Sequence, residues 1–116
     1  MALQRTSLTK VLQLAASAAA IYTNAAGAKA HVKGVLLHNT DTVVREVSVY
    51  WVQPSGGAVG SATLATRIFC VSLAAKETLT LEVPFALVLT ATNETIQAVA
   101  ASANVVNAAV LGDQDA

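Results

Sequence analysis

The residues of this chain that could carry chemistry are two histidines, His31 and His38, and one cysteine, Cys70. The histidines lie seven positions apart in a run typical of a β-strand, where successive side chains point to opposite faces. Without a bulge between them, they point opposite ways and cannot reach one metal ion, because metal ligands converge to about 2 Å. We therefore predict no metal site.

Cys70 lies among Ile68, Phe69, Val71 and Leu73, where a thiol is usually a small buried hydrophobic group. A catalytic thiol would need a neighbouring base and an electropositive setting. As the only cysteine, it also excludes an intramolecular disulfide and provides no zinc framework. We predict a buried thiol without a catalytic role.

The acidic residues give no catalytic pair either. Glu77 and Glu82 fall on opposite faces of one expected strand, and Asp113 and Asp115 belong to an expected polar tail at residues 112–116. General acid–base catalysis needs two such groups close together. We predict that the protein is not an enzyme and takes no cofactor.

The segment from Pro54 to Ser61 is rich in glycine, with Gly56, Gly57 and Gly60. Phosphate-binding loops of that kind follow a strand and begin a helix, whereas here a proline precedes and a β-like run follows. We predict a long surface loop reaching about Thr66, which could fold against a partner.

The two ends of the chain differ in charge. An N-terminal arm, about residues 1–10, carries Arg5 and Lys10, and the C-terminal tail carries Asp113 and Asp115. In a homo-oligomer the arm could pair with the tail of a neighbouring subunit, or the ends could be unrelated and solvated. With the glycine-rich loop, they give the candidate interface residues: Arg5, Lys10, Pro54, Gly56, Gly57, Gly60, Asp113 and Asp115.

These residues would be positioned by short strands. About eight apolar runs, at the spacing of roughly 8 to 12 residues, predict one all-β domain, an antiparallel β-sandwich of jelly-roll or immunoglobulin-like type. Residues 31–53 read as a central hairpin that turns at Asn39–Thr42 and places Trp51 in the core. Residues 11–20 fit either a helix or two strands, 10–15 and 19–23, and we favour strands. We expect them to continue into the fold and not to be a cleaved signal.

The composition predicts contact with other proteins. Seven basic and seven acidic residues give no net charge, so no field attracts nucleic acid or a membrane surface, and no run approaches the ~20 apolar residues of a membrane span. Charged residues make up 12% of the chain, about half the usual ~25%. Weakly charged surfaces tend to associate. We expect a homo-oligomer with much of its surface covered.

Four segments together resemble small β-sandwich virion proteins of tailed bacteriophages: residues 14–40, 48–57, 71–89 and 91–112. The matching positions are Ile21, Tyr22, Gly27, Val32, Leu37, Asn39, Glu77, Thr78, Leu79, Glu82, Ile96, Ala98 and Gly112. The acid before Thr95 is Glu94, where Asp is commoner in that group, and we expect this difference to matter little. The resemblance carries over no functional residue.

The resemblance implies a non-enzymatic part of a phage particle, assembled in the host cytoplasm. We expect a capsid cement or decoration protein that binds the major capsid protein as a homo-oligomer, with three copies the expected number. A tail, collar or fibre-attachment subunit is the alternative. A carbohydrate-binding module is more remote, because it needs exposed aromatic side chains and the chain has only five aromatic residues: Tyr22, Tyr50, Trp51, Phe69 and Phe85.

Overall fold

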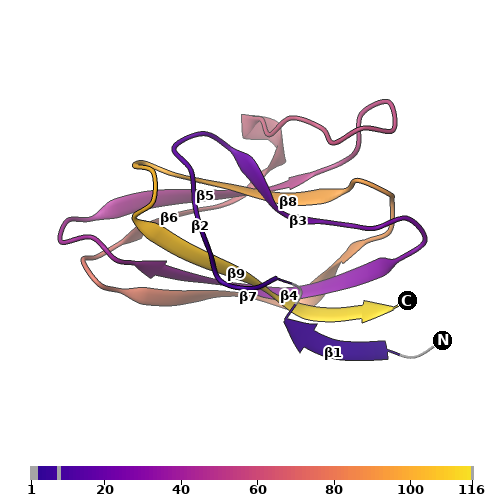
Figure 1. Cartoon of the computed structure of the whole chain (residues 1–116), viewed down its shortest axis with the longest axis horizontal. Helices are drawn as coiled ribbons and strands as arrows, with labels where there is room; N and C mark the ends of the chain where they lie inside the picture. The colour runs from indigo at the N-terminus through magenta and orange to yellow at the C-terminus, as the bar shows by residue number, and fades with distance from the viewer. Residues whose placement is uncertain (1–2, 8, 116) are drawn as a thin grey trace.

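The computed structural model of the chain describes residues 3–7 and 9–115, which form two layers of strands packed face to face (Figure 1). The strands are β1 (Leu3–Ser7), β2 (Leu12–Gln13), β3 (Ala19–Thr23), β4 (Lys29–Asn39), β5 (Arg45–Val52), β6 (Arg67–Leu73), β7 (Thr78–Leu89), β8 (Thr95–Ala100) and β9 (Val106–Asp115). A short 3-10 helix, η1 (Leu64–Thr66), precedes β6. The predicted β-sandwich is confirmed, with nine strands in the described residues instead of about eight.

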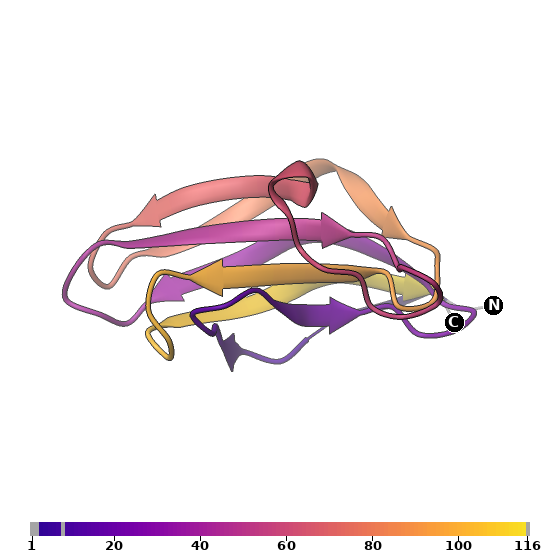
Figure 2. The same cartoon turned by 90° about the horizontal axis from the view of Figure 1, so that it is seen from above.

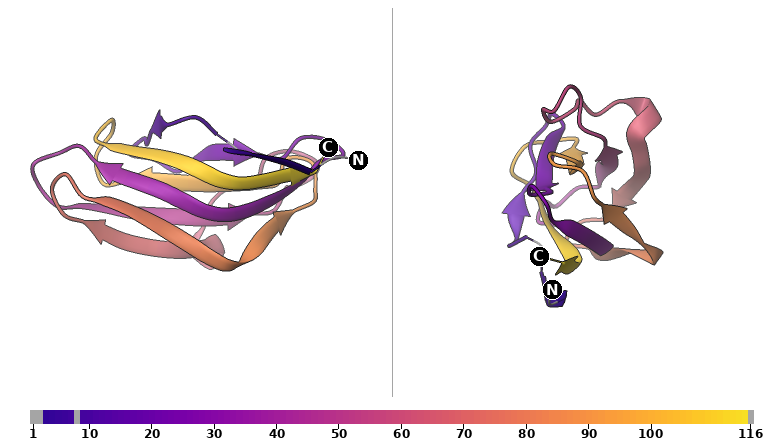
Figure 3. Two further views of the ribbon diagram at one scale, coloured as in Figure 1. Left: turned by 90° about the horizontal axis from the view of Figure 1, so that it is seen from below. Right: turned by 90° about the vertical axis from the view of Figure 1, so that its right-hand side faces the viewer.

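The order of the strands is that of a jelly roll. Strands β2, β9, β4 and β7 form sheet A, in which β1 also pairs with β9, and strands β3, β8, β5 and β6 form sheet B. From β2 onward, each strand is followed by one in the other sheet, except that β5 and β6 are neighbours. Figure 2 shows sheet B toward the viewer, and the left view of Figure 3 shows sheet A. This double Greek-key order decides against the immunoglobulin-like alternative.

The predicted hairpin at residues 31–53 is wrong. Strand β4 pairs with β7 and β9 in sheet A, whereas β5 pairs with β6 and β8 in sheet B, so residues 40–44 cross from one sheet to the other. The two strands face each other across the core, where Leu37 and Val49 belong to one buried cluster. Alternation of apolar residues correctly gave the buried face of β5, but it does not say which strand is the neighbour.

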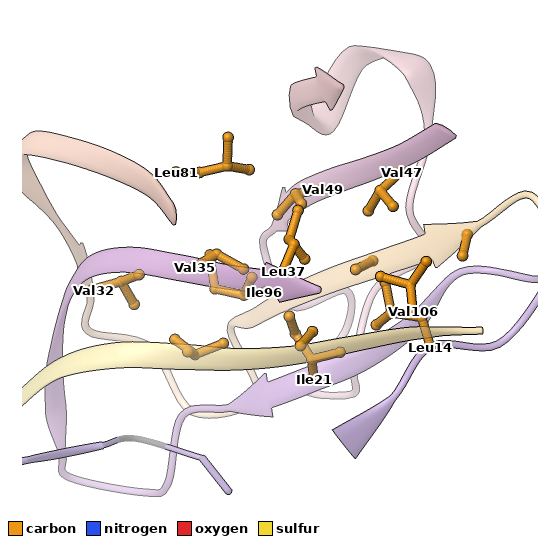
Figure 4. Packing of buried hydrophobic residues seen from close by; sticks show 14 of the residues in the cluster. Leu14, Ile21, Val32, Val35, Leu37, Val47, Val49, Leu81, Ile96 and Val106 are labelled. Carbon is orange, nitrogen blue, oxygen red and sulfur yellow. The ribbon is translucent and has the colours of Figure 1, made fainter. Parts of the chain in front are cut away.

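The core lies between the two sheets (Figure 4). Its fully buried large side chains come from both layers and from the segment before β3: Leu14, Val32, Val35, Leu37, Val47, Val49, Leu73, Leu89, Ile96, Val106 and Val110. Trp51 packs against this cluster, as predicted. Burial of each such side chain stabilises the fold by roughly 1.5 to 3 kcal/mol, which makes this layer the main source of stability.

The segment from Val11 to Ala20 contains no helix. Its residues form β2, a bend and the start of β3, whose bounds match the strand predicted at 19–23. Leu14 is the buried anchor of this segment, and its backbone nitrogen donates to the carbonyl of Val106 at 2.8 Å. The strand interpretation of these residues is therefore confirmed.

Candidate interaction surfaces

The two histidines lie on the same face of β4, contrary to the sequence prediction. The pairing of β4 with both neighbours shifts between Val32 and Gly34, so Lys33 is an extra residue that reverses the alternation. Both histidines are half-buried on the outer face of sheet A, and His38 Nδ1 shares a 2.7 Å hydrogen bond with Thr78 Oγ1. They remain roughly 20 Å apart along the strand. Within the described residues, no three His, Cys, Asp or Glu side chains are grouped to hold a metal ion.

Cys70 is exposed, so the prediction of a buried thiol is wrong. Strand β6 lies at the edge of sheet B, and its alternation turns Phe69 and Val71 toward the core and Cys70 and Ser72 outward. An apolar sequence neighbourhood therefore did not mean a buried position, because an edge strand has one face and one side open to solvent.

The N-terminal arm pairs with its own chain. Residues 3–7 form β1, which runs antiparallel to residues 111–115 of β9 and places Arg5 opposite Asp113 in the register. The expected polar tail is thus part of a strand as far as Asp115, which lies between Leu3 and Lys29 in register. Residues 1, 2, 8 and 116 of the two ends lie outside the described residues, as does the side chain of Arg5.

Asp113 is a buried residue of sheet A and not part of a solvated end. Its Oδ2 accepts a 2.6 Å hydrogen bond from Lys33 Nζ, whose own side chain is more than half exposed. The bulge in β4 brings Lys33 to the outer face, where it reaches across to β9. Lys10 is exposed just before β2. The backbone pairing of Arg5 with Asp113 lies within one chain, and contact between the ends of neighbouring subunits stays a prediction.

The glycine-rich loop is built as a tight turn. Ser55 and Ala58 exchange backbone hydrogen bonds of 2.8 and 3.0 Å around Gly56 and Gly57. Both glycines have positive φ angles, 59° and 79°, which residues with a Cβ adopt at a cost. Pro54 is half-buried and directly precedes this turn. The glycines are thus explained by the turn that they form, without any phosphate ligand.

Side chains of β8 and of the turn before it hold the loop against the body. Asn93 Nδ2 donates to the Gly57 carbonyl at 2.8 Å, and Gln97 Nε2 donates to the Gly60 carbonyl at 2.9 Å. Figure 2 shows the loop crossing the outer face of sheet B on its way to η1. This crossing explains why Val52 and Gln97, which face outward, are nevertheless buried. The loop has hydrogen-bonding partners within its own chain.

Glu94 is a buried, hydrogen-bonded carboxylate whose role the sequence analysis did not predict. The residue is 3% exposed, and its carboxylate accepts four hydrogen bonds. Oε1 accepts from the backbone nitrogens of Thr90 and Ala91 at 3.0 and 3.1 Å. Oε2 accepts from Trp51 Nε1 at 2.7 Å and from Gln53 Nε2 at 2.9 Å. All four donors come from the protein, so this carboxylate fastens the β7–β8 turn to the end of β5.

The length of Glu94 matters more than we expected. Its carboxyl must reach both its own turn and the side chains of β5, so a shorter Asp would leave some of these donors unpaired. The only sequence signal for this role was an acid in a turn that follows Asn93, whose φ of 67° confirms the predicted turn. The sequence position of Glu94, within a turn, does not indicate that its side chain is buried.

A part of the outer face of sheet A carries no formal charge. A shallow hollow of about 230 Å³ is lined by Val11, Leu36, His38, Thr78, Asn107 and Ala108. Val11 is 65% exposed at its rim. A second hollow of about 270 Å³ lies over Gly34 on the same face and does contain charge, from Lys33 and Glu82. Solvent-exposed apolar surface without charge is a typical contact region for another protein.

Comparisons with protein-family models, with curated proteins and with solved structures give no match for this chain. Among the described residues, no helix is long and apolar enough to cross a membrane.

Proposed function

We propose that this protein is a non-enzymatic structural component of a bacteriophage particle, a cement or decoration protein that binds the capsid surface. In this role it makes contacts with the major capsid protein and with other copies of itself. It carries out no reaction and needs no cofactor. Its contribution is the apolar and polar surface that it buries on binding.

The observation that best supports this proposal is the charge-free hollow on the outer face of sheet A. Its six lining residues include no Asp, Glu, Lys or Arg, and Val11 and Leu36 offer apolar side chains to a partner. The cores of protein interfaces are depleted in charged residues in the same way. An open sheet face suits a broad contact with another protein, whereas small ligands usually bind in deep, enclosed pockets.

The fold and the sequence resemblance agree with this role. Jelly rolls recur in viral capsid proteins, in lectins and in enzymes, so the fold alone does not decide among functions. The resemblance to small virion proteins of tailed phages supports a location on the phage particle. The virion, with assembly in the host cytoplasm, is accordingly the proposed location.

A carbohydrate-binding role has less support. Trp51 packs against the core and its indole nitrogen bonds to Glu94, while Tyr22 and Phe69 also pack against the core. Burial raises the pKa of the Tyr22 hydroxyl above its usual value, in keeping with that position. Tyr50 is half-buried on the other face of β5. These four aromatic side chains do not form the exposed platform on which a sugar ring stacks.

The proposal is tested by locating the protein on purified particles from the phage that encodes it. We expect electron cryo-microscopy to show it on the capsid surface, and we expect it to stay with heads when heads and tails are separated. Recovery with tails would instead support the tail, collar or fibre-attachment alternative. Absence from particles would contradict the proposal as a whole.

The charge-free hollow is tested by changing one residue in it. Leu36→Lys places a charge in the hollow, and we expect the variant to fold but to bind capsids lacking the protein at least tenfold more weakly. The matched control is Ala26→Lys, which adds the same charge at an exposed turn between β3 and β4, outside the hollow. Equal binding by both variants would show that the capsid contact lies elsewhere.

A further inference from the structure

We propose that strand β6 pairs with β6 of a second copy, in an antiparallel two-fold contact that joins the two B sheets. This inference deepens the proposed function, since a second copy is one of the partners named there. Strand β6 pairs with β5 on one side only, so the backbone groups on its other side have no strand partner within the described residues. Figure 2 shows β6 at the rim of sheet B. Such an edge is a template for another strand.

Two of the other edge strands, β7 and β3, are less suited to pairing. Edge strand β7 contains Pro84, and its pairing with β4 jumps from Glu82 to Leu87 opposite Gly34 and Val32, which interrupts a regular edge. Edge strand β3 has five residues and a register shift between Ala20 and Tyr22. Proline, charge and irregular pairing are the devices by which natural proteins block edges.

Strand β6 carries few of these devices. Its one shift in pairing falls at Ile68, which leaves residues 69–73 in regular register with residues 45–49 of β5. Arg67, at its first position, is its only charged residue. The edge of sheet B at β6 is therefore open over five consecutive regular residues with no charge among them.

Exposed apolar side chains gather where β6 begins. Leu64, in η1, is 74% exposed, and Ile68, four residues further on, is 36% exposed. Helix η1 leads directly into β6 (Figures 1 and 2). Large apolar side chains next to an open strand edge favour a protein partner over solvent, because the same contact that pairs the strands can bury them.

The partner is a second copy because β6 is compatible with itself. An antiparallel pair centred on Cys70 or Val71 places Arg67 opposite Leu73 or beyond it, so the two Arg67 residues lie at opposite ends. The same pairing brings Ile68 of each copy near the β6–β7 turn of the other, where Ala74 and Ala75 are exposed. The Cys70-centred register keeps Arg67 opposite Leu73, three positions from Lys76 of the other copy, and inward-facing Phe69 and Val71 extend the apolar layer.

We expect a weak contact in solution. Pairing of five to seven residues buries less than the roughly 1,000 Å² of a stable interface, so the dimer should form near millimolar concentration, at a free energy of about 4 kcal/mol. On a surface that holds many copies, the high local concentration would favour the same contact. The two-fold geometry gives dimers, not the three copies expected from sequence.

The test is the mass of the full chain by sedimentation equilibrium over a concentration series reaching about 1 mM. We expect the wild type to shift from one to two copies. Ser72→Lys, on the exposed face of β6, should shift the series to monomer, because each added charge then stands opposite Ile68 or Cys70 of the other copy, and lysine on an edge strand opposes pairing. Thr80→Lys adds the same charge on the exposed face of β7 and should leave the dimer intact.

Cys70 gives a second measurement that needs no destabilising variant. A short bismaleimide should link two wild-type chains through Cys70, and Cys70→Ser should lose the link while its mass in the concentration series stays that of the wild type. A wild type that stays monomeric, forms three copies, or dimerises equally well with Ser72→Lys would overturn the inference. A dimer absent from phage particles would overturn the proposed function and leave this inference intact.

Discussion

The indole nitrogen of Trp51 donates a 2.7 Å hydrogen bond to Oε2 of Glu94, 43 residues further along the chain. Through its other oxygen, the same carboxylate binds the backbone of its own turn at Thr90 and Ala91. One buried side chain thus ties the end of β5 to the turn between the two sheets. The neighbouring residue, Asn93, holds the glycine-rich loop at Gly57. We expect this end of the sandwich to depend on Glu94.

Replacing Glu94 by Ala should lower the free energy of unfolding by roughly 2 to 4 kcal/mol, because several buried donors lose their acceptor at once. Urea unfolding followed by tryptophan fluorescence measures this directly, since Trp51 is the only tryptophan and is itself one of the donors. Glu94→Asp should fall between the wild type and Glu94→Ala, because the shorter carboxylate keeps only some of the bonds.

The matched control for Glu94 is Glu82→Ala. Glu82 is an exposed acid on β7, and removal of such a surface side chain usually changes stability by less than about 0.5 kcal/mol. If both alanine variants unfold at the same urea concentration as the wild type, the hydrogen bonds of Glu94 contribute nothing net to stability.

Gly112 allows β9 to lie close to the bulge of β4. A Cβ at this position would stand far inside contact distance of the carbonyl oxygen of His31, and backbone atoms cannot turn away as a side chain can. We expect Gly112→Ala to cost roughly 3 kcal/mol of unfolding free energy in thermal or urea unfolding.

Gly27→Ala provides the comparison for Gly112. Gly27 has a φ of 75°, and no atom lies within 4 Å of the place that an alanine Cβ would take, so the substitution costs only the backbone strain, about 1 to 2 kcal/mol. If Gly27→Ala lowers the unfolding free energy more than Gly112→Ala does, the backbones of β9 and β4 can move apart to admit a Cβ at little cost in stability.

Sequence patterns predicted which face of a strand points to the core better than they predicted which strands pair with one another. Apolar alternation identified the core-facing side of β5 and β7, because a half-buried strand must alternate. The same pattern could not place β4 and β5 in different sheets, since a short connection such as residues 40–44 fits an arch between sheets as well as a hairpin. Topology depends on contacts between residues far apart, which local patterns do not contain.

The candidate residues show the same limit. Gly56 and Gly57 were correctly placed in a surface loop because positive φ angles are a local property. Asp113 was expected in a solvated tail, but its strand is completed by β4 and β1 from distant parts of the chain. The bulge at Lys33, which puts His31 and His38 on one face, also arises from the pairing of three strands and has no clear signal in the sequence.

The connection between the sheets contains a pH-dependent contact. Asp41 Oδ2 accepts hydrogen bonds from Arg45 Nε and Nη2 at 2.8 and 2.5 Å, and Oδ1 accepts one from the Thr42 nitrogen at 2.7 Å. The hydrogen bond from Arg45, and then that from Thr42, holds the pKa of Asp41 below its usual value near 4. Because the folded-state pKa is the lower one, the contact stabilises the fold above about pH 4 and is lost as the pH falls through the folded-state pKa.

We therefore expect the wild type to lose stability relative to Asp41→Asn as the pH is lowered from about 5 toward 2. Urea unfolding of both proteins across this range measures the difference. The effect should be small, because the pair is partly exposed and solvent screens it. A constant difference between the two proteins across the whole range would mean that ionisation of Asp41 does not contribute.

Asn39 fastens the crossing between the sheets from within. It is fully buried, and its Nδ2 donates to the carbonyl oxygens of Val43, Leu73 and Ala74 at 2.9, 3.2 and 3.1 Å. Its Oδ1 accepts from the backbone nitrogen of Asp41 at 3.0 Å. The amide therefore joins the β4–β5 connection to the turn after β6, and an amide is required because the site needs a donor and an acceptor.

Asn39→Asp should cost roughly 3 to 5 kcal/mol at pH 7, because it would turn a buried carboxylate toward three carbonyl oxygens with no donor for them. Burial and these oxygens raise the pKa of that carboxyl, so lowering the pH should protonate it in the folded state and restore part of the stability. Asn39→Ala, which has no charge, should lose less at pH 7 and show no such recovery. Equal stability of the two variants at pH 7 would contradict this account of the site.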